Sequence, residues 1–487
     1  MNKDDVAACL RVLRALAEDR ALMTEMDEET RQQLLRDAGQ VSRPTRHEQR
    51  QAQRAFRRKN RAEQKTHDAQ LVARAVNRLA RRSSHYVLPA STAPTTAADV
   101  PAPIVEELKK SRNCYVCKDE FRQVHHFYDQ MCPSCAALNW TKRHQTADLR
   151  GRIALVTGAR IKIGYQAALI LLRAGAEVHA TTRFPVDAAE RFAREPDFDA
   201  WSGRLHLHGI DLRHVPTVEK LAEHLEKTLP SLDLLVNNAA QTVRRPPAFY
   251  RTLVEREERL QSALSEGARA LLAGTASETG MVRFAAQDVT PARLSQLALT
   301  EEDVREIEAF PPELRDLDDQ QADLRPMNSW RMTADQVSTV ELLEVHLVNS
   351  VAPFLLISRL RNLMNRRNDR DKHIVNVSAM EAQFARNKKT DKHPHTNMAK
   401  AALNMLTRTS AIDYQRDGIF MNSVDTGWIT DEDPLHHVAR KQVEHDFHPP
   451  LDAIDGAARV LDPIMVGYAT GDHPWGLFLK DYKSIPW

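Results

Sequence analysis

Four of the five cysteines occur as two Cys-x-x-Cys pairs, Cys114/Cys117 and Cys132/Cys135, whereas Cys9 stands alone. Fourteen residues separate the two pairs. Each pair can present two thiolates from a tight knuckle, and two knuckles complete a tetrahedral four-thiolate zinc site. Because protein fills all four positions, the zinc (Zn2+) would be structural. The alternatives are two unrelated cysteine pairs or a redox pair.

The same cysteine usage indicates a cell compartment. Paired cysteines with metal-site spacing fit a reducing environment better than a disulfide framework does, so we expect a cytoplasmic protein. No stretch approaches the roughly 20 consecutive apolar residues of a membrane span. The N-terminal residues 1–20 mix charges into their apolar run and do not read as a secretory signal. We therefore expect no membrane association.

A glycine-containing turn at 157–164, T-G-A-R-I-K-I-G, lies between an apolar strand at 153–156 and an Ala/Leu-rich helix at 165–174. Glycines here permit a tight turn and let the backbone N–H groups of a helix N-terminus approach a pyrophosphate. The turn therefore predicts a nucleotide site. Its candidate cofactor-binding residues are Gly158, Arg160, Lys162, Ile163 and Gly164.

The end of the second strand bears on the choice of cofactor. An NAD-binding site usually has Asp or Glu there to bind the ribose 2′-hydroxyl. Here a strand is expected at 177–182 and Arg183 follows it, with no carboxylate to repel a 2′-phosphate. Arg183 therefore favours NADP(H) over NAD(H). The alternative is an ordinary surface arginine at a strand end.

The elements that must position these residues alternate between strand and helix. Further apolar strands are expected at 205–210, 232–236, 373–377 and 420–424. Such alternation is typical of a parallel, doubly wound α/β sheet. The alternation stops near 245 and resumes near 340. We interpret residues 245–335, which are charged and contain helix signals, as a helical insertion.

The chain before the sheet differs in composition. Residues 3–23 predict an amphipathic helix, and 43–82 are helix-prone and dense in Arg and Lys. A Pro/Ala/Thr/Ser-rich stretch at 83–103 is typical of a linker. The expected domains are a basic helical arm with its linker (1–107), a zinc ribbon (108–145) and the Rossmann domain (146–487).

The basic arm admits two interpretations. Charge runs of this kind are usually solvated helix faces. A basic helix beside a zinc ribbon can also contact a nucleic acid or another polyanion, or a protein partner. Since the run has few aromatic residues for base stacking, we favour the solvated face. For the ribbon we likewise favour a folding role, in which it docks the arm onto the main domain.

Residues 152–487, apart from the insertion, resemble the short-chain dehydrogenase/reductase family. The family's T-G-x-x-x-G-x-G turn is matched at Thr157, Gly158 and Gly164. Its other motifs are matched by Asp211 after the third strand, by Asn349, and by the ending 476–482, which is similar to the retinol-dehydrogenase-like branch. Its N-N-A-G element is matched by N-N-A-A at 237–240, with alanine in place of the last glycine. The resemblance implies a seven-stranded parallel Rossmann sheet, hydride transfer between a nicotinamide and a carbonyl or alcohol carbon, and a homo-oligomer.

The resemblance also implies roles for single residues. Asp211 would meet the adenine and Thr430 the nicotinamide amide. Lys400 would hold the ribose and lower the pKa of the family's tyrosine, and Asn349 would anchor a water on the proton relay. Further cofactor contacts are expected at Leu212, Asn238 and Ala239.

The acid–base position departs from the family pattern. Four residues before Lys400 stands Thr396 instead of tyrosine, and an aliphatic hydroxyl is a far weaker acid than a phenol. The neighbouring His395 is a substitute, because imidazole titrates near neutrality. His393 is a further substitute, and so is Tyr250, which lies in the insertion. For each histidine we favour the alternative, an ordinary polar loop residue.

Two other positions depart. The family's catalytic serine aligns with Ala379, whereas Ser378 lies one residue earlier and faces the other side of the strand unless the register shifts. Lys162 replaces the middle glycine of the turn, where its Cβ would crowd a pyrophosphate and its ammonium would neutralise one.

Two functions remain open from the sequence. The first is an NADP(H)-dependent oxidoreductase with a reworked acid–base group, acting on a small-molecule substrate that the insertion shapes. The second is a nucleotide-binding pseudoenzyme or scaffold whose arm and zinc ribbon bind a macromolecule. The missing tyrosine favours the second. Because a pure scaffold has little use for Asn349 and Lys400, we favour the enzyme.

Overall fold

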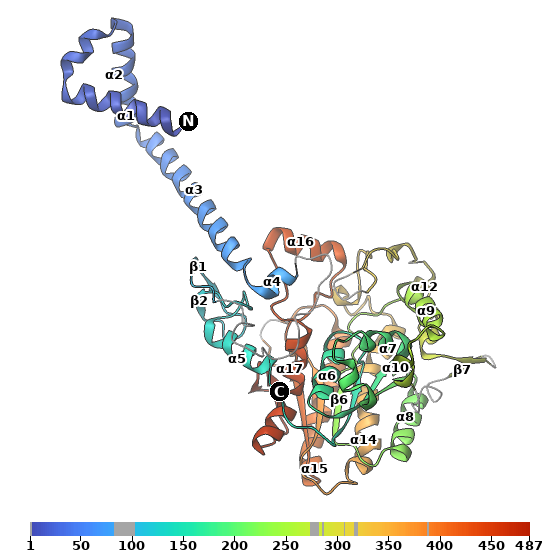
Figure 1. Ribbon diagram of the computed structural model, residues 1–487. Coiled ribbons are helices and arrows are strands. Elements are labelled where there is room, and N and C mark those ends of the chain that lie inside the picture. Colours follow the sequence, from blue (N-terminus) through green and yellow to red (C-terminus); the bar gives the residue numbers. More distant parts are fainter. Residues whose placement is uncertain are drawn as a thin grey trace. The chain divides into compact units, whose positions relative to one another are not determined.

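The computed structural model describes residues 2–81, 103–272, 282–284, 287–305, 307–315, 320–386 and 389–487. Backbone contacts divide the chain into two compact units, Met1–Gln70 and Leu71–Trp487 (Figure 1). The boundaries expected at 107 and 145 stay predictions. The expected linker at 83–103 lies, apart from its last residue, outside the described residues.

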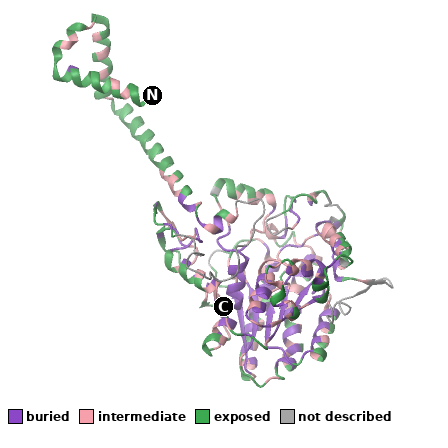
Figure 2. Ribbon diagram, in the orientation of Figure 1, coloured by how far each residue is buried: buried purple, intermediate pink, exposed green. Residues whose placement is uncertain are grey.

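The first unit is helical and mostly exposed (Figure 2). It contains α1 (Lys3–Glu18), a 3-10 turn (Arg20–Glu25), α2 (Glu28–Ser42) and most of α3 (Arg46–Val72). The helix expected at 3–23 ends earlier because Asp19 is extended and its carboxylate accepts a hydrogen bond from the Ala21 N–H at 2.8 Å. That bond caps the next turn.

An eight-stranded sheet forms the centre of the second unit, in the order β12-β11-β10-β9-β6-β3-β4-β5. The seven strands from β11 to β5 run parallel, which confirms the predicted doubly wound sheet. Their bounds are β3 Ile153–Thr157, β4 Glu177–Thr182, β5 Leu205–Gly209, β6 Leu234–Asn237, β9 Lys372–Ser378, β10 Ile419–Asp425 and β11 Phe478–Lys480.

The eighth strand, β12 (Lys483–Ile485), was not predicted. It pairs antiparallel with β11 through the two-residue turn Asp481–Tyr482, in which both residues have positive φ, 48° and 64°. Two-residue hairpin turns of type I′ require positive φ at both residues and usually have Asn-Gly or Asp-Gly there. Asp-Tyr gives no comparable signal in the sequence.

Alternating side chains of the strands build a core on each face of the sheet. On one face Ala154 and Val156 pack with helices α6 (Lys162–Arg173), α7 (Pro185–Ala193) and α17 (Ala453–Thr470). On the other, Ile153 and Leu155 pack with α8 (Val215–Thr228), α14 (Ala352–Met364) and α15 (Pro394–Arg416). Burial on both faces explains why the strands read as apolar runs.

Within the described residues, the segment Thr339–Met364 is long and apolar enough to cross a membrane by length and composition, contrary to our sequence expectation. It comprises α13 (Thr339–His346), a π-helical turn (Leu347–Val351) and α14. Half of its most apolar stretch is buried inside the fold, where Leu356, Leu360 and Leu363 join the core. Its apolar character is therefore accounted for by packing on the sheet.

The insertion at 245–335 is not purely helical. It contains α9 (Pro247–Gln261), α10 (Glu266–Ala270), α11 (Pro291–Leu294) and α12 (Glu302–Arg305), together with an antiparallel hairpin of β7 (Val282–Phe284) and β8 (Gln287–Val289). Another helix outside the sheet core, α16 (Leu435–His445), follows β10.

The cysteine segment packs against the Rossmann fold. It consists of the hairpin β1 (Glu107–Asn113) and β2 (Glu120–Gln123) and helix α5 (Pro133–Arg143). The short α4 (Val76–Ala80) contacts it through a hydrogen bond from the Val76 N–H to the His126 carbonyl at 2.9 Å. The buried Arg143 guanidinium bonds to Asp452 at 2.7 Å and to Asp455 at 2.8 Å, both at the start of α17. The Tyr128 hydroxyl donates to the same Asp455 at 2.6 Å. These buried ionic bonds fix the segment's position on α17.

Candidate functional site

A cleft of about 1170 Å³ opens at the carboxyl ends of the parallel strands, where the strand order reverses between β3 and β6. Ligands of open α/β sheets bind at this switch point. Most of the predicted site residues line it: Gly158, Arg160, Lys162, Ile163, Gly164, Arg183, Asp211, Leu212, Asn238, Ala239, Ser378, Thr396, Lys400 and Thr430. Asn349 and His395 do not line the cleft.

The turn leaves no room for a side chain at either of its two glycines, Gly158 and Gly164. A Cβ on Gly158, whose φ is +70°, would lie 2.9 Å from the Cα of Ala239. A Cβ on Gly164 would lie 2.3 Å from the carbonyl oxygen of Gly158. Because Ile161 before the helix has no polar side chain, it cannot cap the N–H groups of the first turn of α6. Those groups are the kind that bind a phosphate.

Hydrogen bonds hold the turn against the end of β6. The Thr157 hydroxyl accepts from the backbone N–H groups of Asn238 and Ala239, each at 3.0 Å. The Asn238 side-chain amide donates to the carbonyls of Thr157 at 3.0 Å and Gly158 at 3.2 Å. The motif residues of β3 and β6 thus brace each other across the switch point.

Lys162 occupies the middle glycine position with a glycine-like backbone, φ +54°. This left-handed conformation is strained for a residue with a side chain. Its Nζ lies 3.8 Å from Glu432 Oε1. Although burial opposes ionisation of Glu432, the charges of Lys162 and Arg245 keep the pKa of its carboxyl below the usual value. The Lys162 ammonium therefore faces a carboxylate at the wall of the cleft.

The end of the cleft beside β4 and β5 carries several arginines. Arg183 donates from Nη2 to the Tyr250 hydroxyl at 2.8 Å, and its guanidinium lies 4.5 Å from the centre of that ring. Arg160 is buried and paired with Asp187 at 2.9 Å. Tyr250, which sequence analysis proposed as a substitute acid, therefore lies beside the expected 2′-phosphate position.

The carboxylate of Asp211 forms an ion pair within the protein. Its carboxylate accepts hydrogen bonds from the Arg213 side chain, the shortest at 2.6 Å, and Arg213 also bonds to Glu344 at 2.9 Å. Although burial opposes its ionisation, Arg213 keeps the pKa of Asp211 below the usual value. Any contact of Asp211 with an adenine would be made alongside this pair. Leu212 follows it on the cleft wall.

Lys400 and Thr396 lie one helical turn apart on α15 and both line the cleft. The Lys400 ammonium donates to the Val377 carbonyl at 2.7 Å, and burial lowers the pKa of Lys400 to about 8. The hydroxyls of Thr396 and Ser378 are buried, and neither has a hydrogen-bond partner among the described residues. Because both residues line the cleft, these two hydroxyls are placed to bond to a ligand there.

Asn349 sits in the π-helical turn and is fully buried. Its side-chain oxygen accepts from the Gln241 N–H at 2.7 Å, and its amide nitrogen donates to the Gln241 carbonyl at 3.0 Å. Gln241 itself lines the cleft. Asn349 therefore positions the loop after β6, and its amide is engaged with backbone where the resemblance implied a water.

Only one of the two candidate histidines lies at the cleft. His395 is buried away from the cleft lining, with Nε2 3.3 Å from Glu341 Oε1, because its position at the start of α15 directs it toward α13. His395 therefore does not face the cleft, and its acid–base role stays a prediction that this placement does not support. His393 does line the cleft, where it stacks 4.0 Å from Trp330 and bonds to Asn397 at 3.1 Å.

Sequence reasoning missed Tyr115, a phenol of the cysteine segment that lines the cleft. Its hydroxyl accepts a hydrogen bond from the Trp428 N–H at 2.9 Å, and a Cβ on Gly427 would lie 3.0 Å from the Tyr115 hydroxyl oxygen. Burial raises the pKa of Tyr115. No pattern in the sequence connects Tyr115 with Trp428, which lies 313 positions later. Because Tyr115 follows Cys114, it was considered only as part of the metal motif.

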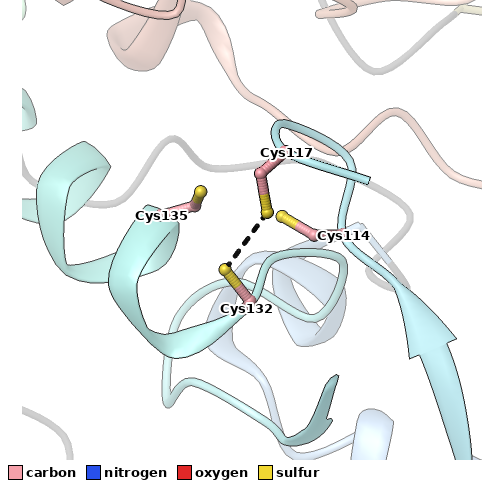
Figure 3. A group of neighbouring side chains, drawn as sticks. All are labelled: Cys114, Cys117, Cys132 and Cys135. Atoms are coloured by element: carbon pink, nitrogen blue, oxygen red, sulfur yellow. Dashed lines mark hydrogen bonds between the residues drawn. The ribbon is translucent and has the colours of Figure 1, made fainter. Parts of the chain in front are cut away.

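The four cysteines of the two pairs converge as predicted (Figure 3). Their sulfur atoms all lie within 4.8 Å of one another, and the Sγ atoms of Cys117 and Cys132 are 3.6 Å apart. A disulfide would need about 2.05 Å. Two sulfurs bound to one tetrahedral zinc at about 2.3 Å are separated by about 3.8 Å. The four thiols of Cys114, Cys117, Cys132 and Cys135 therefore fit a zinc ion.

A nucleotide cleft at the switch point of a doubly wound sheet defines a Rossmann-type dinucleotide-binding protein. Comparison with known families is more specific. The model described as short chain dehydrogenase matches residues 152–259, and that described as Enoyl-(Acyl carrier protein) reductase matches 328–448. The chain belongs to the short-chain dehydrogenase/reductase family, a family of NAD(P)-dependent oxidoreductases.

Among individual proteins, the chain is 31% identical over 390 residues to Uncharacterized protein R665 of Acanthamoeba polyphaga mimivirus, covering 77% of this chain and 74% of that one. It is 35% identical over 95 residues to a WW domain-containing oxidoreductase of Drosophila melanogaster, covering 19% of this chain and only 23% of that one.

Solved structures with a similar fold include the Pseudomonas aeruginosa RhlG/NADP active-site complex, with 19% identity, a TM-score of 0.44, and coverage of 68% of this chain and 95% of that one. NADPH-bound carbonyl reductase from chicken fatty liver has 17% identity, a TM-score of 0.42, and coverage of 70% and 100%.

Proposed function

We propose that this protein is an NADP(H)-dependent oxidoreductase that interconverts a carbonyl and an alcohol. One observation carries the proposal: a single cleft combines a phosphate-type turn, Arg183, and Lys400 with two hydroxyls that lack partners in the described residues. The bound nicotinamide would supply or accept the hydride. The residues of the chain would bind the dinucleotide, orient the substrate oxygen and manage one proton.

Arg183 supports the choice of NADP(H). It follows β4 with no carboxylate at the strand end, and Tyr250 holds its guanidinium in place by a hydrogen bond and by ring contact. A fixed guanidinium is well suited to a 2′-phosphate, because it can form two parallel charged hydrogen bonds. NAD(H) would leave this arginine without that anion, so we propose it as the weaker cofactor.

Lys400 is proposed to carry the proton in place of the missing phenol. Burial brings the pKa of its ammonium to about 8, within the range useful for acid–base catalysis. The hydroxyls of Thr396 and Ser378 would bind the substrate oxygen, and Thr396 lies one turn before Lys400 on the same face of α15. In carbonyl reduction one proton would leave the Lys400 ammonium and reach the oxygen as the hydride reaches carbon.

Turnover tests this proposal. NADPH oxidation should be followed with a panel of aldehydes and ketones for the wild type and for Lys400→Ala. Turnover by the wild type that disappears in Lys400→Ala supports the assignment. Equal rates for the two proteins would contradict the role of Lys400. Tight NADPH binding without turnover of any carbonyl would favour the second function.

That second function is a nucleotide-binding scaffold. The absence of tyrosine at Thr396 favours it, as does the separate compact unit Met1–Gln70 with its exposed basic helix α3. Here α3 would bind a protein or an acidic polymer such as a nucleic acid. A chain lacking residues 1–70 should then lose the partner and keep NADPH affinity. A full chain that captures no partner would argue against the scaffold.

Three further features complete the proposal. The four cysteines would hold a structural Zn2+ that keeps Tyr115 in the cleft wall, and the protein would be cytoplasmic.

The protein would also form a homo-oligomer through α14 and α15, which expose the large apolar side chains Phe354, Met398, Met405 and Ile412. Large apolar side chains exposed on the helices of a sheet are suited to such an interface. Sedimentation of the purified chain tests the oligomer.

A further inference from the structure

A second group of metal-ligating side chains lies at the edge of the sheet, away from the cysteines. It consists of Glu177 and His179 on β4 and His206 on the edge strand β5. His179 and His206 are directly opposed in the strand register, so both rings project from the same face. The rings stack with centroids 4.6 Å apart and planes inclined by 20°.

Both imidazoles contact the same oxygen of Glu177. The Nε2 atoms of His179 and His206 lie 3.1 Å and 3.4 Å from the same oxygen, Oε1 of Glu177. Ligand atoms of one first-row metal ion, each at about 2.0–2.2 Å, are separated by roughly 3.0–3.5 Å at octahedral or tetrahedral angles. The two distances to Glu177 Oε1 lie in this range, and all three ligand atoms lie within 4.8 Å of one another.

A buried neighbour fixes the orientation of one ligand. His179 Nδ1 lies 2.9 Å from His208 Nε2, and His208 is 1% exposed. Metal-binding histidines usually have the other ring nitrogen engaged in this way, which holds the ring and selects the nitrogen that faces the metal. The side chains of Glu177 and His206 are 38% and 31% exposed, so an ion can enter from solvent and keep water ligands.

From this geometry we propose a second metal site, in which Glu177, His179 and His206 bind a divalent transition-metal ion such as zinc. Two imidazoles and one carboxylate with open positions are typical ligands for such ions. Glu177 begins β4, whereas Arg183 at the nucleotide cleft follows the other end of that strand. The ion would therefore tie the edge strand β5 to β4 and take no part in hydride transfer.

Without an ion, the two imidazoles would donate N–H hydrogen bonds to Glu177, and the group would be an ordinary ion-pair cluster. Zinc content separates the two cases. Full-length protein should be equilibrated with zinc at micromolar free concentration, and the bound metal measured by mass spectrometry. The site predicts one equivalent of zinc in the wild type beyond that bound by the cysteines, and its loss in His206→Ala.

Controls assign the metal to one site or the other. Cys132→Ser should lose the cysteine-bound metal and keep the additional equivalent. Glu177→Gln preserves the side-chain shape and should weaken the second site by at least about tenfold. His224→Ala, a neighbour 6.0 Å from the His208 ring and outside the three ligands, should change nothing. Equal zinc content in wild type, His206→Ala and Glu177→Gln would overturn the proposal.

Discussion

The Tyr115 hydroxyl accepts a hydrogen bond from the Trp428 backbone N–H at 2.9 Å, which brings the cysteine segment into the wall of the nucleotide cleft. Tyr115 immediately follows Cys114, and Trp428 lies in the loop after β10. A metal held by the four cysteines would therefore fix one wall of the cleft as well as its own segment.

Loss of the metal should destabilise the whole second unit. An ion that binds only the folded state at a hundredfold excess over its Kd contributes about 2.7 kcal/mol, which corresponds to a fall in Tm of about 3 °C for a unit as long as Leu71–Trp487. We expect this fall on chelation or in Cys132→Ser, measured by calorimetry with metal content. Cys9→Ser, the matched control at an exposed lone cysteine, should be unchanged. A Cys132→Ser protein with wild-type Tm would contradict the zinc site.

Replacing Gly164 by alanine should abolish nucleotide binding. The new Cβ would lie 2.3 Å from the Gly158 carbonyl oxygen and 2.4 Å from the Asn238 side chain, so the turn has to move. Overpacking of this kind costs about 1–3 kcal/mol of folding free energy. Gly203→Ala, where a Cβ meets nothing within 4 Å, is the control. Wild-type NADPH affinity in Gly164→Ala would mean that the turn does not hold the pyrophosphate.

Lys400 should oppose stability while supporting activity. Its pKa is lowered to about 8 in the folded protein, whereas an unfolded lysine titrates near 10.4. The unfolded state therefore binds more protons between these values, and stability should rise with pH from about 8 to 10.4. Lys400→Met removes this penalty, up to about 3 kcal/mol at pH 7, and should also abolish turnover.

Urea unfolding of wild type and Lys400→Met at pH 7 and pH 9 measures the first effect. A lower stability of Lys400→Met at pH 7 would show that the ammonium is net stabilising. In the wild type, carbonyl reduction should decline above about pH 8, because the proposed donor loses its proton there. A reduction rate that stays flat through pH 9 would exclude Lys400 as the donor.

Substitution of Arg183 should change cofactor preference. Arg183→Ala removes the charged contact with a 2′-phosphate, worth about 1.5–3 kcal/mol in total, so the Kd for NADPH should rise about 10- to 100-fold. The Kd for NADH should change little. Arg122→Ala, on β2 and outside the residues that line the cleft, serves as a charge control. Equal losses for both cofactors would place Arg183 elsewhere than at the 2′-phosphate.

The sheet could be predicted because its signals are local. Apolar runs bounded by turns identified the six longer parallel strands, and Gly158 and Gly164 marked the turn whose geometry excludes a Cβ. The four cysteines came together because two knuckles at that spacing carry their own geometry. β12 was missed because three residues and an Asp-Tyr turn give no periodic signal.

The remaining parts of the site depend on long-range packing. His395 and His393 are two residues apart at the start of α15, yet only His393 lines the cleft, a distinction set by how the helix packs on α13. Tyr115 reaches Trp428 because Arg143 anchors α5 on α17 through Asp452 and Asp455. Neither the placement of the two histidines nor the contact of Tyr115 with Trp428 can be inferred from residue spacing or composition.

The most direct test of the central claim is a fluorescence titration of the purified, zinc-loaded protein with NADPH and with NADH. We predict saturable NADPH binding with a Kd at least about tenfold below that for NADH, since only NADPH carries the 2′-phosphate that pairs with Arg183. Absence of binding for both cofactors would contradict the account, because Lys162 would then close the turn. Equal affinity for both would retain a nucleotide site and refute its NADP(H) preference.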